Sequence, residues 1–351
     1  MRKTLLALSC LTLAACNPAP DQASISRQLA TQQVLPAYQA WLQANQQLGQ
    51  SATAFCQGSA DLAQARQQLL AVQQQWAALQ PLAVGPLNEG NLAWQVQFWP
   101  DKKNLVQRQV EALLTSKPQL VQADLDSASV VVQGLSAYEY VLFDQAIDLG
   151  QAEQKARYCP LLTGIATHQQ QLAGRVLEQW QAKDGMLAQL SQFPNARFAD
   201  GQEAVAELLR TQVNALELLK KKLGTPLGRQ SKGQPQPYQA EAWRSQASLA
   251  LIGASLGSAQ TLWQGSEEGS LRQLLPSAQQ SLAEQIDQAW LDTQAQFKAL
   301  DQPLDVLLKD AAGRERLNAF YDSLSRLHQL HASQLAKALN IQLGFNAHDG
   351  D

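Results

Sequence analysis

A carboxylate within an otherwise apolar helix is the strongest chemical signal in this sequence. Residues 128–143 read ASVVVQGLSAYEYVLF, a segment that is apolar on nearly all sides, as buried helices are. Ser136 and Glu139 stand three residues apart on one face of it, and Gly134 precedes them. Because a buried carboxylate is costly unless paired, Glu139 is expected to have a cation, a set of hydrogen-bond donors or a metal as partner. Gly134, without a side chain, would let a ligand or another backbone approach.

A second apolar helix, expected over residues 241–263, supplies a candidate partner. Arg244 lies near its start, and a guanidinium group matches a carboxylate with two parallel hydrogen bonds. We therefore expect Arg244 to meet Glu139 where two halves of the chain come together. Two interpretations stay open: a salt bridge that only holds the halves in register, or a polar pocket that binds a ligand between them. The candidate ligand-binding residues are Gly134, Ser136, Glu139, Trp243, Arg244 and Ser245.

Histidines offer a weaker metal candidate. His328 and His331 are three residues apart on the expected last helix and could present two nitrogens to a metal, with Asp322 as a third ligand. The alternative is a solvated or interface face of that helix. His168 stands alone on a polar helix face, where a ligand role is not expected.

Other polar and aromatic groups have ordinary alternatives. Trp94, Phe98 and Trp99 form an aromatic cluster that either packs in the core or stacks on a ligand. The terminal Asp349 and Asp351 either bind a hard cation or belong to an ordered tail. Ser136 lies in mid-helix, outside any Gly-x-Ser-x-Gly elbow, so a serine hydrolase is not expected.

The elements that must position these residues are helices. Over residues 203–223, apolar side chains recur at steps of three and four, and Gly224 and Pro226 are expected to end that helix. No segment of useful length alternates with period two, so the fold class is predicted to be all-α. Further helices are expected at 24–55 (bent at Pro36), 60–80, 104–116, 127–146, 158–184, 244–265, 275–299 and 311–339.

The length of 351 residues suggests two domains. Residues 191–201 break the helical periodicity and are predicted to link an N-terminal bundle, 24–190, to a C-terminal bundle, 202–351. Each side then holds about four long helices, as a simple bundle requires. A loop at 224–237, rich in Gly, Pro, Gln and Lys, is expected to be solvated and to border a cleft.

The N-terminus has the layout of a bacterial secretory signal. Arg2 and Lys3 precede a short apolar run that ends in Leu-Ala-Ala-Cys16, which looks like a lipoprotein processing box. Residues 1–15 would then be removed, Cys16 would carry acyl chains as the membrane anchor, and residues 16–23 would form a tether. The alternative is an ordinary secretory signal with a coincidental cysteine. Asn17 is not the aspartate associated with inner-membrane retention, which favours the outer membrane.

The cysteines and the net charge indicate the cellular compartment and the kinds of partner to expect. Cys10 leaves with the signal and Cys16 is lipidated, so Cys56 and Cys159 remain and are expected to form a disulfide in an oxidising compartment. Two buried free thiols are the alternative. The formal net charge is −3, and no strongly basic stretch stands out, so nucleic acid is not an expected partner.

Several segments together resemble the imelysin family. The motif region GLSAYEYVLF corresponds to a stretch where family members carry Gly-x-His-x-x-Glu on a buried helix. Gly134 and Glu139 match this motif, whereas Ser136 replaces its histidine. The other similar segments are Gly85-Pro86-Leu87, Phe98-Trp99-Pro100-Asp101, Ala242-Trp243-Arg244-Ser245 and the terminal GFNAHDGD.

The resemblance implies two related four-helix bundles, with the polar site near their interface. It also implies a periplasmic or outer-membrane setting, iron or another metal as cofactor or cargo, and envelope iron-uptake components as partners. Serine is a poor ligand for transition metals, so Ser136 counts against a metal at the motif itself. Part of the family is described as metallopeptidase, but this sequence contains no His-Glu-x-x-His.

The sequence thus predicts a lipid-anchored, periplasm-facing binding protein of an iron- or metal-uptake system, with Glu139 as the charged anchor of its pocket. An enzyme is not expected. The alternatives are a metallopeptidase-like enzyme and a non-catalytic interaction scaffold in the envelope.

Overall fold

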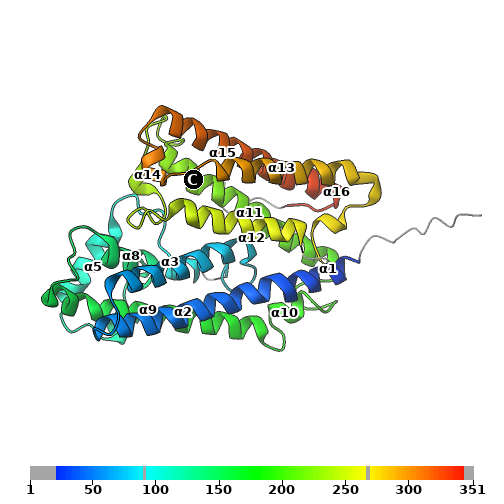
Figure 1. The fold of residues 1–351 in the computed structure, drawn as a ribbon. Helices are drawn as coiled ribbons and strands as arrows, with labels where there is room; N and C mark the ends of the chain where they lie inside the picture. The colour runs from blue at the N-terminus through cyan, green and yellow to red at the C-terminus, as the bar shows by residue number, and fades with distance from the viewer. Residues whose placement is uncertain (1–20, 90–91, 266–268, 344–351) are drawn as a thin grey trace, which may run out of the picture.

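The computed structural model describes residues 21–89, 92–265 and 269–343, and within these ranges every regular element is a helix (Figure 1). This confirms the predicted all-α class. The first half contains α1 (Gln22–Leu29), η1 (Ala30–Val34), α2 (Leu35–Cys56), α3 (Leu62–Leu79), η2 (Gln80–Leu82), α4 (Leu92–Val96), α5 (Leu105–Ser116), α6 (Gln122–Asp126), α7 (Val130–Gln133), α8 (Leu135–Phe143), α9 (Ala152–Gln181) and α10 (Met186–Gln189). The second half contains α11 (Gly201–Leu227), η3 (Pro237–Gln239), α12 (Ser248–Gln264), η4 (Arg272–Leu274), η5 (Ser277–Gln279), α13 (Gln280–Lys298), α14 (Leu304–Leu307), α15 (Ala311–Gln329), η6 (Leu330–Leu335) and α16 (Ala336–Ala338).

The first long helix matches the predicted range closely. It begins after Asp21, whose side chain accepts a hydrogen bond from the backbone N–H of Ala23, and it continues to Cys56. The bend expected at Pro36 takes the form of a π-helical turn, η1, just before that proline. Proline has no N–H to give to the helix, so an irregular turn on its N-terminal side is a natural accommodation.

Two groups of helices pack against each other. In Figure 1, α2 and α9 lie in the lower part of the molecule and α13 and α15 in the upper part, with α3 and α12 between them. Helix α3 contacts α12, α1 contacts α11, and η2 contacts both α11 and α12, so the two halves of the chain meet over several elements. A single cluster of buried side chains runs through both halves and includes Trp41, Trp180, Trp263 and Trp290. The division into two domains stays a prediction.

The predicted disulfide is present. Cys56 at the end of α2 is bonded to Cys159 in α9, with an S–S distance of 2.08 Å. A closed loop of this length removes conformational freedom from the unfolded chain and stabilises the fold by several kcal/mol, about 4–5 in the chain-entropy model. The bridge therefore fastens α2 to α9 within the first half.

Several predicted helices have different bounds from those expected, and three of them bear on the site. The helix expected over 127–146 is broken at Gly134 into α7 and α8. The one expected over 241–263 begins only at Ser248. Helix α11 was expected to stop at Gly224 and Pro226, but it passes through both and ends at Leu227, capped by Gly228 in a left-handed conformation with φ of 81°.

The predictions for the two ends of the chain concern residues outside the described ranges. These are the signal sequence, Cys16 and most of the tether, and also Asp349 and Asp351. Within the described ranges, no helix combines the length and the apolarity needed to cross a membrane.

Candidate functional site

The break at Gly134 serves a close approach between two backbones. Gly134 is extended, and a β-carbon at this position would lie 2.7 Å from the carbonyl oxygen of Val96 and 3.1 Å from that of Gln95. Two residues later, the Ser136 hydroxyl donates a hydrogen bond of 2.9 Å to the Phe98 carbonyl. The space at Gly134 that we expected to admit a ligand or a backbone is therefore filled by the chain segment that includes Gln95 and Val96.

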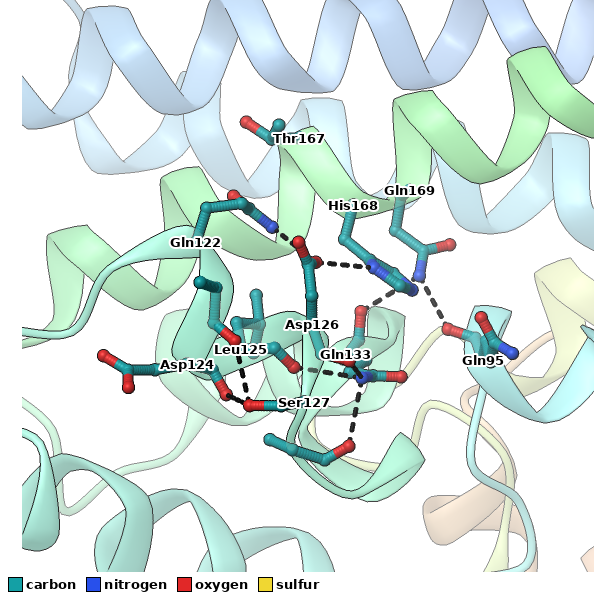
Figure 2. Close-up of polar contacts among 12 residues, drawn as sticks. Gln95, Gln122, Asp124, Leu125, Asp126, Ser127, Gln133, Thr167, His168 and Gln169 are labelled. Atoms are coloured by element: carbon teal, nitrogen blue, oxygen red, sulfur yellow. Dashed lines mark hydrogen bonds and ion pairs between the residues drawn. The ribbon is translucent and has the colours of Figure 1, made fainter.

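Hydrogen bonds hold Gln133, the residue directly before this break, in place (Figure 2). The Gln169 side-chain amide donates to the carbonyls of Gln95 and Gln133, at 2.7 and 3.0 Å. Gln133 in turn donates to the Leu125 carbonyl at 3.0 Å. His168 lies beside this network with Nδ1 3.3 Å from the Asp126 carboxylate, so it is paired rather than alone, and its own burial lowers its pKa.

Glu139 lies inside the protein and is held by the other half of the chain. It is 4% exposed, and its Oε1 accepts hydrogen bonds from the backbone N–H and the hydroxyl of Ser245, at 2.8 and 2.7 Å. Burial raises the pKa of Glu139 above its ordinary value, while these two hydrogen bonds and the charge of Arg244 act in the opposite direction. Of the three kinds of partner that the sequence left open for Glu139, the structure supplies the hydrogen-bond donors.

Arg244 is not the direct partner of Glu139, so that prediction was wrong. Its Nε donates to Asp144 Oδ2 at 2.9 Å, and its Nη2 donates to Asn104 Oδ1 at 3.0 Å. The guanidinium also lies over the rings of Trp243 and Tyr140, 4.4 and 5.1 Å from their centres. Asp144 directly follows α8. It therefore forms the ion pair with Arg244 that the sequence analysis had assigned to Glu139.

The segment Glu241–Ala247, here called the site loop, presents these groups. Ala242 and Gln246 have φ of 51° and 58°, a left-handed conformation that side chains other than glycine adopt at a cost. Contacts at both ends of the loop compensate for this. Ser245 and Arg244 are bonded to the first half as described, and the Ser248 hydroxyl donates to the Glu241 carbonyl.

A fully buried ion pair that the sequence analysis missed holds the start of the site loop. Lys222 of α11 lies 2.7 Å from Glu241, and both side chains are 3% exposed. The Lys222 ammonium also donates to the Gln80 side chain at 2.6 Å, which links η2, α11 and the loop. The sequence did contain a signal for the burial of Lys222. This lysine is three residues after Leu219 and so falls on the buried face of α11.

The predicted pocket is divided into two spaces by the site loop. Ser136 and Glu139 line a void of only about 20 Å³, room for about one water. A much larger cleft of about 760 Å³ opens on the other side of Trp243 and Arg244, which line both spaces. Three segments line the cleft: residues 143–145 after α8, residues within 235–246, and residues within 305–309 around α14.

Two further expectations concern the edges of this region. The loop after α11 was expected to border a cleft, and Pro235 and Pro237 do line it. The aromatic cluster is split: Trp94 packs on Phe98 with ring centres 5.7 Å apart, whereas the Trp99 indole donates to the Gln239 carbonyl at 3.0 Å. Trp99 therefore ties the first half to η3, beside the cleft.

The histidine pair does not converge on a common point with Asp322. His331 is fully buried between Trp263 and Trp290, and its Nδ1–H donates to the Leu327 carbonyl at 2.9 Å. Burial lowers its pKa to about 4. His328 lies 3.6 Å from a Glu217 oxygen, and Asp322 pairs with Arg229, two residues beyond the end of α11. Within the described ranges, no group of three or more His, Cys, Asp or Glu is placed to hold a metal.

Comparison with known proteins identifies the architecture. The family model described as Imelysin matches residues 34–331. An imelysin-like protein from Psychrobacter arcticum 273-4 has a similar structure, with a TM-score of 0.77 at 21% identity, over 92% of this chain and 97% of that chain. A putative iron-regulated protein A precursor from Parabacteroides distasonis ATCC 8503 gives 0.74 at 15% identity, with the same coverage. No curated protein matches the chain significantly. At these identities the two structures establish a shared fold.

Proposed function

This chain belongs to the imelysin family, and we propose that it is a non-enzymatic binding protein that takes up a ligand in the cleft between its two halves. We place it in the envelope, anchored by a lipid on Cys16 and facing the periplasm, as part of an iron- or metal-uptake system. The link to iron comes from the resemblance and from a structural relative named as an iron-regulated protein A precursor.

The observation that carries the proposal is the cleft of about 760 Å³ beside the site loop. Small-molecule sites are typically concave spaces of about 300–1,000 Å³ that combine apolar walls with a few polar groups. Here Trp243, Tyr238 and Leu308 supply apolar surface, and Arg244 and Asp144 supply charged groups. Both halves of the chain contribute, as expected for a ligand that binds between them.

The position of the cleft fits an anchored protein. Helix α1 begins at Gln22, at one end of the molecule in Figure 1, whereas α8 and α14 lie at the opposite end. A lipid at Cys16, a few residues before α1, would hold the α1 end near the membrane. The cleft would then open toward the periplasm, where a diffusing ligand can reach it.

The experiment is a binding assay with the lipid-free mature protein. Iron content after purification, and equilibrium binding of ferric chelates, are measured for the wild type and for Gln145→Trp, which adds bulk to the cleft wall. Gln285→Trp is the matched control, an exposed glutamine on α13 outside the cleft. We expect saturable binding that Gln145→Trp abolishes and Gln285→Trp retains. Negligible binding by all three proteins, or equal binding by both variants, would contradict the proposal.

A second function, an interaction scaffold, is favoured by one observation. The void beside Glu139 is almost filled, and Glu139 is occupied by Ser245. This contact then serves to hold the two halves in register. Substitutions at Glu139 and at Ser245 both break this contact. If they lower the unfolding free energy and leave ligand binding unchanged, the role of Glu139 is to hold the two halves together.

A further inference from the structure

The charged groups of the cleft neutralise one another. Arg244 and Asp144 are joined at 2.9 Å, and Lys309 and Asp305 at 3.2 Å. The cleft lining therefore carries two positive and two negative charges in two local pairs. Such a surface gives little net attraction to a ligand of high charge, because each of its ions already has a counter-ion.

Arg244 is especially poorly placed to receive an anion. Its side chain is 6% exposed, and besides Asp144 it is bonded to Asn104 and lies over two aromatic rings. An incoming carboxylate would have to displace Asp144 from a mostly buried pair, which leaves Asp144 without its partner at a cost. We therefore assign Arg244 a structural part in the cleft wall, where it fixes the Trp243 ring.

Apart from Gln145 and Gln246, the remaining wall of the cleft is apolar and aromatic. Tyr238 is 69% exposed, although tyrosine rings are usually covered on at least one face, and it contacts Trp243 edge to face with ring centres 5.0 Å apart. Pro235 and Pro237 flank it in the same wall. An exposed tyrosine ring in edge-to-face contact with a tryptophan offers a surface on which a planar group can pack.

We propose that the cleft binds an organic molecule of zero net charge that carries a planar ring, and that this ring packs against Tyr238 and Trp243. The inference rests on the proposed function and names its ligand class. In an iron-uptake setting the cargo would be ferric iron enclosed in a neutral chelate. A bare ion would lack ligands here, since the described residues bring no cluster of three His, Cys, Asp or Glu together, and a polyanionic chelate would meet a wall without free positive charge.

Three ferric chelates separate charge from ring content. Tris(benzohydroxamato)iron(III) is neutral and carries three rings, tris(catecholato)iron(III) is a trianion with three rings, and tris(acetohydroxamato)iron(III) is neutral without rings. Affinities are measured by titration calorimetry with free chelator at the same concentration in cell and syringe, and a titration of each free chelator alone corrects for its own binding. We expect the benzohydroxamate complex to bind at least about tenfold more tightly than the other two, the difference that one well-packed ring supplies.

Two variants locate the interaction. Tyr238→Ala removes the exposed ring and should weaken the benzohydroxamate complex about tenfold. Lys309→Ala removes the most exposed positive charge of the cleft, 72% exposed, and an anion site would lose affinity in this variant. We expect it to leave the preference for the neutral complex in place. Unchanged thermal unfolding of both variants confirms that these surface changes do not disturb the fold.

The outcomes distinguish the ligand class from the function. Tighter binding of the catecholate trianion, weakened by Lys309→Ala, would overturn the neutral ligand and keep the binding function. Equal affinity for the two hydroxamates, unaffected by Tyr238→Ala, would overturn the role of the ring. Failure of all three complexes to bind would contradict both the ligand class and the proposed iron-chelate function.

Discussion

The contact between Glu139 and Ser245 gives the sharpest prediction about stability. Glu139→Ala removes the acceptor of two hydrogen bonds inside the protein. The Ser245 hydroxyl has a second acceptor, the Ala242 carbonyl at 3.2 Å, and can turn to it. Within the described part of the chain, the Ser245 N–H bonds to Glu139 alone, so this partly buried donor would lose its partner. Glu139→Gln, in contrast, keeps an oxygen at the same place.

The expected magnitudes follow from these contacts. A stranded buried donor costs about 1–3 kcal/mol, and the lost packing of the side-chain methylenes adds about 1–2 kcal/mol. Relief from the buried charge offsets part of this, so we expect Glu139→Ala to lose about 2–4 kcal/mol of unfolding free energy. Glu139→Gln should stay within about 1 kcal/mol of the wild type, because it trades a charge-assisted acceptor for a neutral one while it removes the desolvation cost.

The pH dependence has a definite sign. Because burial raises the pKa of Glu139 in the folded protein, the native state binds a proton at this carboxyl more readily than the unfolded chain does. The wild type therefore loses stability relative to Glu139→Gln as pH rises from the unfolded pKa through the folded one, and the difference is constant above that. Urea denaturation of the three proteins at pH 4–8, followed by far-UV circular dichroism, measures both effects. Equal losses for the Ala and Gln variants, or a pH-independent difference between Gln and wild type, would refute this reasoning.

Three other substitutions test the surrounding structure. Gly134→Ala places a β-carbon 2.7 Å from the Val96 carbonyl; we expect at least about 2 kcal/mol of destabilisation by urea denaturation, whereas a neutral effect would contradict the close approach. Lys222→Met leaves Glu241 as an unpaired buried carboxylate and should cost about 3–5 kcal/mol, of which the added change Glu241→Leu recovers at least half; a double variant no more stable than the single one would show otherwise. His331→Phe removes the buried imidazole, whose pKa is 6.5 in the unfolded chain and about 4 in the folded one. Because protonation favours the unfolded chain, the unfolding free energy of the wild type should fall by about 2 kcal/mol relative to the variant between pH 7 and pH 5. Parallel curves of stability against pH would contradict burial of a neutral imidazole.

Most helices were predictable because their signal is local. Apolar spacing places α3, α5 and α13 within about five residues of their predicted bounds. The exceptions depend on distant contacts. Nothing in the sequence around Gly134 shows that Gln95 and Val96 pass close to it, so the break between α7 and α8 could not be foreseen from periodicity. Likewise, the apolar run after Glu241 continues the helical pattern while tertiary contacts hold its first turn as a loop.

The candidate site was predicted in outline and not in its pairings. Burial of Glu139 against the second half follows from the cost of a carboxylate on an apolar helix, and the structure confirms it. Its partners are the backbone N–H and the hydroxyl of Ser245, a residue that the sequence analysis placed in the site as a ligand-binding group and not as the partner of Glu139. Arg244 binds Asp144 instead because the backbone of the site loop determines which carboxylate its side chain can contact. The spacing of residues in the sequence does not reveal that backbone conformation. The cleft wall around Tyr238 likewise arises only when three separate segments assemble.

The most direct test of the binding function is hydrogen exchange followed by mass spectrometry, with and without tris(benzohydroxamato)iron(III). We predict that the chelate slows exchange in peptides that cover residues 143–145, 235–246 and 305–309, and that Tyr238→Ala abolishes this protection. Protection confined to other segments, such as α15 around His328, or no protection at chelate concentrations well above its measured dissociation constant, would contradict a ligand site in the cleft.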